Sequence, residues 1–138
     1  MERIEDVAEY ILGRLGYMPS MKLHKLIYYS HLYSLCTLGK PLTADTITAC
    51  PSGPKYESLI EKQGGQWILG PKDIESEPHL LDQESQMCVD AILAELGPYT
   101  GRQLSDFTMS DPFYVKKIGA IITDQDILDH FAASFAPK

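Results

Sequence analysis

The segment from Ser20 to Gly39, SMKLHKLIYYSHLYSLCTLG, constrains the fold more than any other part of the chain. Wound as an α-helix with about 3.6 residues per turn, it points apolar and aromatic side chains in nearly every direction. A helix that is apolar on all sides is buried. Its internal lysines and histidines, and a length just short of a bilayer-spanning helix, favour a core helix over a membrane span. We therefore predict that a buried central helix over about 20–39 organises the fold.

Both ends of this helix carry boundary signals. Ser20 is a residue type that caps helix N-termini, because its hydroxyl oxygen can accept a hydrogen bond from a first-turn amide. Gly39 can adopt the left-handed conformation that closes a helix, and Pro41 prevents its continuation. Lys25 is the unusual residue inside it, since a buried ammonium must be paired or must reach water. Two alternatives stay open for Lys25: a side chain that snorkels to solvent, or one paired with an acceptor at an interface.

The rest of the chain also reads as mainly helical. A helix over residues 3–15 repeats apolar side chains on one face, with Glu2, Glu5, Asp6 and Glu9 on the opposite, water-facing side. Residues 70–79 are polar and aperiodic, which is typical of a mobile loop. In the first half of the chain, the other predicted elements are a strand over 46–50, a turn over 51–54, a helix from Pro54 to Gln63 and a short strand over 66–69. In the second half we predict a helix over 82–96 with Met87, Cys88, Ala91, Ile92 and Leu96 inward, and a helix after Thr100 bearing Leu104 and Phe107. A further helix starts at Asp111 and Pro112, and a last one is capped by Thr123, with Ile127, Leu128, Phe131 and Phe135 inward.

Length and composition bound the architecture. A chain of 138 residues with 44% hydrophobic residues can bury one sizeable core and is too short to suggest two. We predict one compact, mainly α domain over 1–138, with a minor short β pairing. The formal net charge of −7 argues against a direct nucleic-acid partner and against an anionic membrane, because both attract basic surfaces.

The cysteines and the N-terminus bear on localisation. Cys36, Cys50 and Cys88 are odd in number, far apart and without metal-binding spacing, as in proteins of a reducing compartment. Acidic residues interrupt the start of the chain, where a secretion signal would be basic and then apolar. We therefore expect a cytoplasmic protein.

Catalytic and metal-binding patterns are missing from the sequence. His24 and His31 lie on one face of the central helix but about 10 Å apart along its axis, too far for one metal ion, and we interpret them as partly exposed residues at the edge of the core. We predict no catalytic residues, no metal and no cofactor. Eight tyrosines and one tryptophan, against four phenylalanines, are typical of proteins that bind other proteins, and Trp67 is expected in an exposed hairpin.

The order of landmarks resembles a known family. The segments MKLHKLIYYSHLYSL (21–35) and GKPLTADTITACPSGPKYESL (39–59) resemble the Panacea antitoxin domain, also called SocA-like or GepA-like. The matching positions are Lys22, Leu23, Lys25, Leu26, Tyr28, Tyr29, Gly39, Pro41, Leu42, Ala49, Gly53, Pro54, Leu104, Thr108, Pro112 and Phe113, and residues 121–131 resemble the family's closing helix. The chain departs from the family's preferences at Cys50, Ser52, Lys55, Met109 and Phe113, and most of these changes remove apolar or aromatic groups near the Gly-Pro turn. These departures bear on the identity of the partner rather than on the fold.

The resemblance implies a small cytoplasmic protein, often phage- or mobile-element-associated, that neutralises a toxin by direct binding and in some members delivers it to a protease. Our first hypothesis is such an antitoxin-like binding protein. The alternatives are a phage or mobile-element inhibitor of a host defence protein on the same scaffold, and an enzyme with a diffuse site. We predict that Lys25, Tyr29, Pro54 and Tyr56 border one partner-binding surface, with Trp67 as a further contact.

The central-helix interpretation makes a direct prediction for Leu26→Asp. A carboxylate buried without a partner should cost several kcal/mol, against a total stability of about 5–15 kcal/mol. Circular dichroism melts of the parent and variant measure this loss. A variant that melts within a few degrees of the parent would show that the helix is not central.

Overall fold

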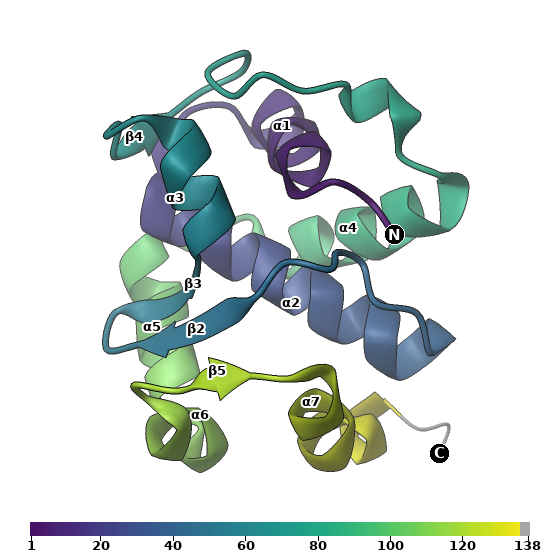
Figure 1. Ribbon diagram of the computed structural model, residues 1–138, viewed down its shortest axis with the longest axis vertical. Coiled ribbons are helices and arrows are strands. Elements are labelled where there is room, and N and C mark those ends of the chain that lie inside the picture. Colours follow the sequence, from purple (N-terminus) through teal and green to yellow (C-terminus); the bar gives the residue numbers. More distant parts are fainter. Residues whose placement is uncertain (136–138) are drawn as a thin grey trace.

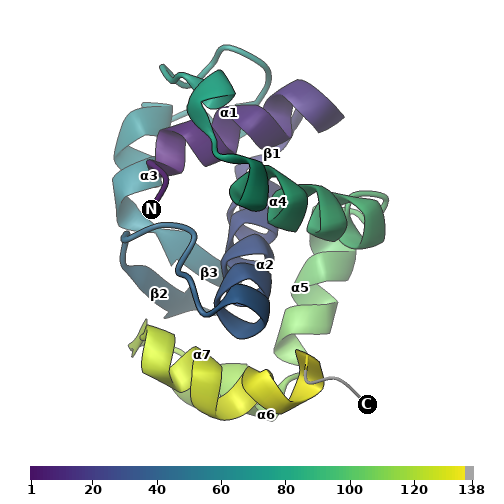
Figure 2. The same cartoon turned by 90° about the vertical axis from the view of Figure 1, so that its right-hand side faces the viewer.

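A computed structural model describes residues 1–135 of the protein. Helix α2 (Ser20–Leu38) runs through the middle of the molecule, with α1 (Ile4–Leu15) on one side of it and α7 (Asp124–Phe131) on the opposite side (Figure 1). Figure 2 shows α4 (Gln83–Leu96) and α5 (Gly101–Met109) on one side of α2 and strands β2 (Ile47–Cys50) and β3 (Gly53–Tyr56) on the other. The prediction of a mainly helical fold around a central helix is confirmed.

The described residues form seven α-helices and five short strands. The remaining helices are α3 (Glu57–Gln63) and α6 (Pro112–Lys117), and the strands are β1 (Met18–Pro19), β2 (Ile47–Cys50), β3 (Gly53–Tyr56), β4 (Ile68–Leu69) and β5 (Ile121–Ile122), with short 3-10 helices at Pro78–Leu80 and Ala132–Phe135.

The strands make two small antiparallel sheets. One has the order β3-β2-β5, with Ile47 opposite both Tyr56 and Ile122. The other pairs β1 with β4, placing Met18 opposite Leu69. The predicted strands over 46–50 and 66–69 are confirmed as β2 and, more briefly, β4. Strands β1 and β5 were not predicted, because two residues carry no periodicity.

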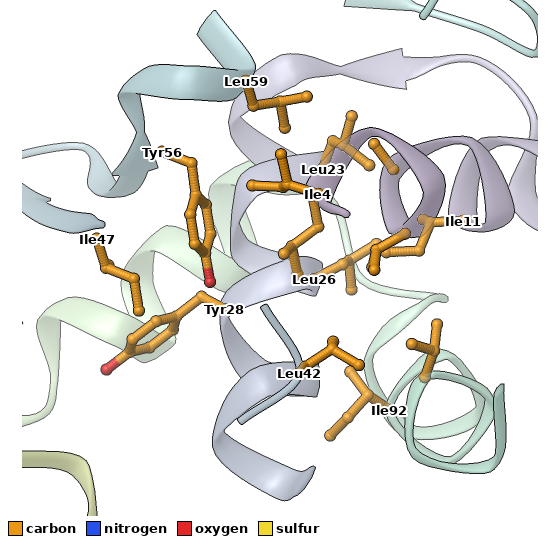
Figure 3. Packing of buried hydrophobic residues seen from close by; sticks show 14 of the residues in the cluster. Ile4, Ile11, Leu23, Leu26, Tyr28, Leu42, Ile47, Tyr56, Leu59 and Ile92 are labelled. Carbon is orange, nitrogen blue, oxygen red and sulfur yellow. The ribbon is translucent and has the colours of Figure 1, made fainter. Parts of the chain in front are cut away.

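The core is built on α2. Leu23, Leu26 and Ile27 have no exposed surface, and side chains from α1, α3 and α4 pack around them (Figure 3). The rings of Tyr28 and Tyr56 belong to the same cluster, beside Ile47 of β2 in Figure 3. Both tyrosine hydroxyls are buried without a hydrogen-bond partner among residues 1–135. The all-round apolar pattern of the central helix thus reports its burial correctly.

One end of α2 is as predicted and the other is not. Gly39 adopts a left-handed conformation, and its amide donates to the Leu35 carbonyl at 3.0 Å. The assignment of Ser20 as the N-terminal cap is wrong, because Pro19 holds that position and Ser20 is the first helical residue. The Ser20 amide instead donates to the Trp67 carbonyl at 2.8 Å. The start of the helix is therefore held by a backbone hydrogen bond to Trp67, the residue before β4, where a side-chain cap was expected.

Pro54 lies in strand β3 opposite Ala49, so its prediction as the first residue of a helix is wrong. Helix α3 begins three residues later, at Glu57. Strand β3 forms the edge of its sheet, where a proline is tolerated because its missing N–H is not needed on the open side.

The acidic residues of α1 are buried, not solvated as predicted. The two Glu9 carboxylate oxygens accept the backbone amides of Lys72 (2.6 Å) and Ile74 (3.2 Å). Asp6 accepts the amide of Glu77 at 2.8 Å. Residues 70–77 are irregular, as predicted for 70–79, whose last two residues begin the short 3-10 helix. These carboxylates hold the segment against α1, and its mobility stays a prediction.

Four helix starts follow the local sequence. Asp82, Thr100, Asp111 and Thr123 each accept a hydrogen bond from a first-turn amide of the helix that follows. This confirms the predicted caps at Asp82, Thr100 and Thr123 and the predicted helix start at Asp111 and Pro112.

The inward faces of the later helices are only partly confirmed. On α4, Cys88 and Ile92 face the core as predicted, whereas Met87 is 63% exposed and Val89 and Leu93 are buried.

On α5, Leu104 is buried but Phe107 is 57% exposed. On α7, Ile127 is fully buried, and Leu128 and Phe131 pack against the core from partly buried positions. The side chain of Phe135, which was predicted to face inward, lies outside what the structure describes.

We expect Glu9→Gln to destabilise the protein by about 1–3 kcal/mol. A glutamine has one carbonyl oxygen, so its NH2 group would face one of the two amides that Glu9 now accepts. Urea unfolding and hydrogen exchange at Ile74 measure the loss. Glu95→Gln, an exposed change on α4, is the matched control. Equal stabilities of the two variants would contradict a structural role for Glu9.

Candidate partner-binding site

His24 connects three elements beside the start of α2. Its Nδ1 accepts the backbone amide of Tyr56 at 3.1 Å, so the ring proton lies on Nε2, which donates to Gln63 Oε1 at 2.9 Å. The Gln63 side-chain nitrogen donates in turn to the Gln66 carbonyl at 3.0 Å. This chain of hydrogen bonds joins α2, β3, α3 and the turn that leads to Trp67.

The surroundings of His24 favour its neutral form. Burial is the main cause of a lowered pKa, and the nearby cations Lys55 and Lys25 lower it further, while the hydrogen bond to Gln63 acts in the opposite direction. Because His24 is buried, the prediction that it lies partly exposed at the edge of the core is wrong.

His31 has a similar role further along α2, seven residues after His24. Its Nδ1 accepts the Leu42 amide at 3.1 Å, and its Nε2 donates to Asp124 Oδ1 at 2.8 Å. It is also buried, again contrary to the prediction. His31 therefore fastens α2 to the loop before β2 and to the first residue of α7.

Lys25 is buried under the turn between β2 and β3, with only 1% of its surface exposed. Its ammonium donates to the Met21 carbonyl at 3.3 Å, and no carboxylate of the described residues pairs with it. Gly53 lies over it with φ of 125°, and a Cβ at that glycine would stand 2.6 Å from Lys25 Cε. The snorkelling alternative is therefore wrong. Burial, and then the charge of Lys55, lower the pKa of Lys25 to about 8.

A hollow of about 320 Å³ is lined in part by Met21, the residue whose carbonyl accepts the Lys25 ammonium. It lies between the start of α2, the turn between β2 and β3, helix α3 and strand β4. We call it the Trp67 groove, and its lining residues are Pro19, Ser20, Met21, His24, Ser52, Lys55, Ile60, Trp67 and Ile68. Trp67 is 63% exposed and Ile68 58% exposed, so large apolar side chains border the hollow in contact with solvent.

The five predicted partner-binding residues lie in different environments. Trp67 lines the groove and is exposed, as predicted. Lys25, Pro54 and Tyr56 are buried and do not line it. Tyr29 is half-buried and faces α5 instead. The structure therefore leaves Trp67 exposed at the groove, and the partner-binding role of all five residues stays a prediction.

Tyr29 is held by two residues of α5. Its hydroxyl lies 2.7 Å from the Thr108 hydroxyl, which donates to the Leu104 carbonyl and so accepts the tyrosine proton. Its ring lies 5.7 Å from that of Phe107, measured between centroids. Burial raises the pKa of Tyr29 to about 12, with the bond to Thr108 acting against this rise. Tyr29 thus joins α2 to α5.

Sequence reasoning missed several residues of the groove. Met21, Ile60 and Ile68 are ordinary apolar residues of short elements, and no spacing distinguishes them from core positions. Lys55 did carry a signal, because it stands where the resembled family prefers valine. The structure places that lysine in the wall of the groove.

Two further properties of the described residues bear on function. Across residues 1–135, no group of three histidine, cysteine or acidic side chains is arranged to hold a metal ion. None of the helices in that stretch of the chain has the length and apolar character needed to cross a membrane.

Comparison with known proteins places this scaffold in a family. The profile described as "Antitoxin SocA-like, Panacea domain" matches residues 23–114, about two thirds of the chain. The chain belongs to the SocA-like Panacea domain family. The matched range of this Panacea protein runs from α2 to α6 and includes all five predicted partner-binding residues. It ends before residues 121–131, so their likeness to the family's closing helix stays a prediction.

No curated protein and no solved structure matched the chain.

The buried ammonium predicts a pH-dependent effect of Lys25→Met. With a pKa near 8 in the folded chain and 10.5 ordinarily, Lys25 binds its proton more weakly when folded, so its contribution to stability rises between pH 8 and 10.5. Methionine keeps the packing and removes the buried charge. We expect the variant to be more stable than the parent by about 1 kcal/mol or more at pH 7. This advantage should shrink as the pH rises through that range.

Urea unfolding of both proteins from pH 7 to 10 tests this, with exposed Lys116→Met as the control. Burial raises the pKa of Tyr28 and Tyr56. Both tyrosines are present in the parent and in each variant, so their effect cancels in the difference between the free energies of unfolding. A Lys25→Met protein that is less stable than the parent by the same amount at every pH would show that the lysine stabilises the fold.

Proposed function

We propose that this Panacea protein is a non-enzymatic antitoxin, which binds one protein toxin directly in the cytoplasm and blocks it. The observation that carries the proposal is the family match over residues 23–114. That range supplies the groove residues from His24 to Ile68, so the family region includes an exposed apolar hollow next to a fixed scaffold. Hollows bordered by exposed aromatic side chains are common at protein interfaces.

The charge of the chain supports a protein partner. A net charge of −7 on 138 residues gives an acidic surface, which would accelerate the capture of a basic toxin by electrostatic steering. Such steering weakens with salt, since charges further apart than about 8–10 Å are screened at physiological ionic strength.

Neutralisation can follow two routes. The antitoxin can cover an essential surface of the toxin, in which case the toxin persists in an inactive complex. It can instead present the toxin to a protease, in which case the amount of toxin falls. We propose covering as the basic activity and delivery to a protease as an addition to it, because both begin with the same binding step.

Coexpression tests the proposal. The product of a growth-inhibiting reading frame next to the gene is induced alone or with this chain. We expect restored growth, a stable complex on size-exclusion chromatography and toxin that regains activity when the complex is dissociated. An immunoblot of toxin levels over time separates the two routes, because only delivery to a protease shortens the toxin's half-life.

The Leu26→Asp variant is the control for this experiment, since it should lose the fold and with it the rescue. An intact chain that neither restores growth nor binds the toxin would overturn the proposal. A toxin that is chemically altered after coexpression with this chain would overturn only the proposal that the antitoxin is not an enzyme.

A further inference from the structure

We propose that the Trp67 groove receives a short segment of the partner protein in which an acidic side chain lies next to a bulky apolar one. This inference rests on the proposed function and specifies how the partner is recognised. Three properties of the groove carry it: exposed apolar surface, a positive local charge in an acidic protein, and a framework that is already fixed in the free chain.

The apolar surface comes from side chains that point outward at one place. Trp67 and Ile68 are adjacent in sequence and both more than half exposed, and Met21 of α2 lies with them in the wall. Tryptophan is enriched among the residues that dominate binding energy, because its large ring gains much from losing water. The volume of about 320 Å³ is at the small end of ligand pockets, so it fits one or two side chains rather than a whole helix.

The local charge is opposite to that of the whole chain. Lys55 is the charged side chain in the groove wall, and no aspartate or glutamate of the described residues lines it. The buried ammonium of Lys25 donates to the carbonyl of Met21, a residue of the groove wall, and no carboxylate of the described residues pairs with it. In a protein with a net charge of −7, this hollow is therefore a local cationic site.

The positive end of α2 adds to this charge. Pro19 precedes the helix and offers no side-chain cap, and the first turn contains no acidic residue. The N-terminal end of a helix carries partial positive charge, which attracts anions. Pro19, Ser20 and Met21 all line the groove, so this end of the helix opens into it. Charge complementarity thus selects a segment with a carboxylate.

The framework around the groove needs little ordering. The Ser20 amide holds the Trp67 carbonyl, and the His24, Gln63 and Gln66 hydrogen bonds hold the turn before it. On the other side, the Ser105 hydroxyl donates to the Ser52 carbonyl at 3.3 Å and ties the turn between β2 and β3 to α5. A preformed site loses less conformational entropy on binding, which raises affinity for a given contact area.

The test uses a phage-displayed library of random peptides, selected against the full-length chain. We expect the selected peptides to share an aspartate or glutamate beside a large apolar residue. The chain's single tryptophan reports on the site, so binding of a synthetic consensus peptide should shift its fluorescence to shorter wavelength. Replacing the peptide's acid by its amide should weaken binding at least about tenfold.

Variants then locate the binding. Trp67→Ala and Lys55→Glu should each lower the affinity for the consensus peptide at least about tenfold, as measured by calorimetry. Two matched controls, Met87→Ala with the same exposure as Trp67 and the exposed Lys116→Glu, should bind like the parent. Lys55→Gln replaces Lys55→Glu if the latter does not fold in a thermal melt. Selected peptides without a carboxylate, or peptides whose binding ignores Trp67 and Lys55, would overturn the inference.

The same variants in the coexpression experiment separate this inference from the proposed function. Loss of rescue with Trp67→Ala and Lys55→Glu, but not with Met87→Ala, would support both. Full rescue by the two groove variants would show that the groove does not bind the toxin, and it would not contradict the antitoxin function. Failure of the parent chain to rescue would overturn the function, while the peptide measurements would still decide what the groove binds.

Discussion

The structure depends on how α2 satisfies its polar groups while it is surrounded by protein. A buried polar group without a partner costs stability, so His24 and His31 have to find partners in neighbouring elements. Each imidazole accepts a backbone amide on Nδ1 and donates from Nε2, to Gln63 in one case and to Asp124 in the other. The two side chains lie seven residues apart on the same helix face, which allows one to hold β3 and α3 while the other holds the loop before β2 and α7. Hydrophobic burial brings these elements to α2, and the two histidines fix where along the helix each one lies.

The features that could be predicted from the sequence are those whose causes are local. Caps such as Thr100 and Thr123 were identified correctly, because the partner of each cap lies three residues away in its own helix. The central helix was also identified, since its pattern needs no knowledge of its neighbours. The predictions for Glu9 and His31 were wrong because their partners lie 63 and 93 residues away. A polar residue with a distant backbone partner looks the same in the sequence as one that faces water.

At the candidate site, too, features with a local cause were predicted correctly and features that depend on distant contacts were not. Trp67 was predicted as an exposed contact from its glycine-flanked setting, and the structure places it in the groove wall. Tyr56 was predicted to border the same surface as Lys25 and Pro54, yet the pairing of β3 with β2 places its ring in the core. Lys55, the neighbour of Tyr56, points the other way, since successive side chains of a strand alternate between its faces. The turn does border the groove, but the alternation of β3 decides which of the residues that follow it reaches the surface.

Lys25 connects the fold to the proposed site through its charge rather than through contact. An apolar side chain of similar length would fill the same space beneath Gly53 without a buried charge, so packing alone does not account for a lysine there. The ammonium is too deeply buried to touch a partner in this structure, but it donates to the carbonyl of Met21 in the groove wall, and charges are screened less within protein than in water. A carboxylate docked near Lys55 would also partly compensate the Lys25 charge. In that arrangement the buried Lys25 ammonium destabilises the free chain, and binding of the acidic segment reduces this destabilisation. The free energy of unfolding therefore depends on whether the groove is occupied.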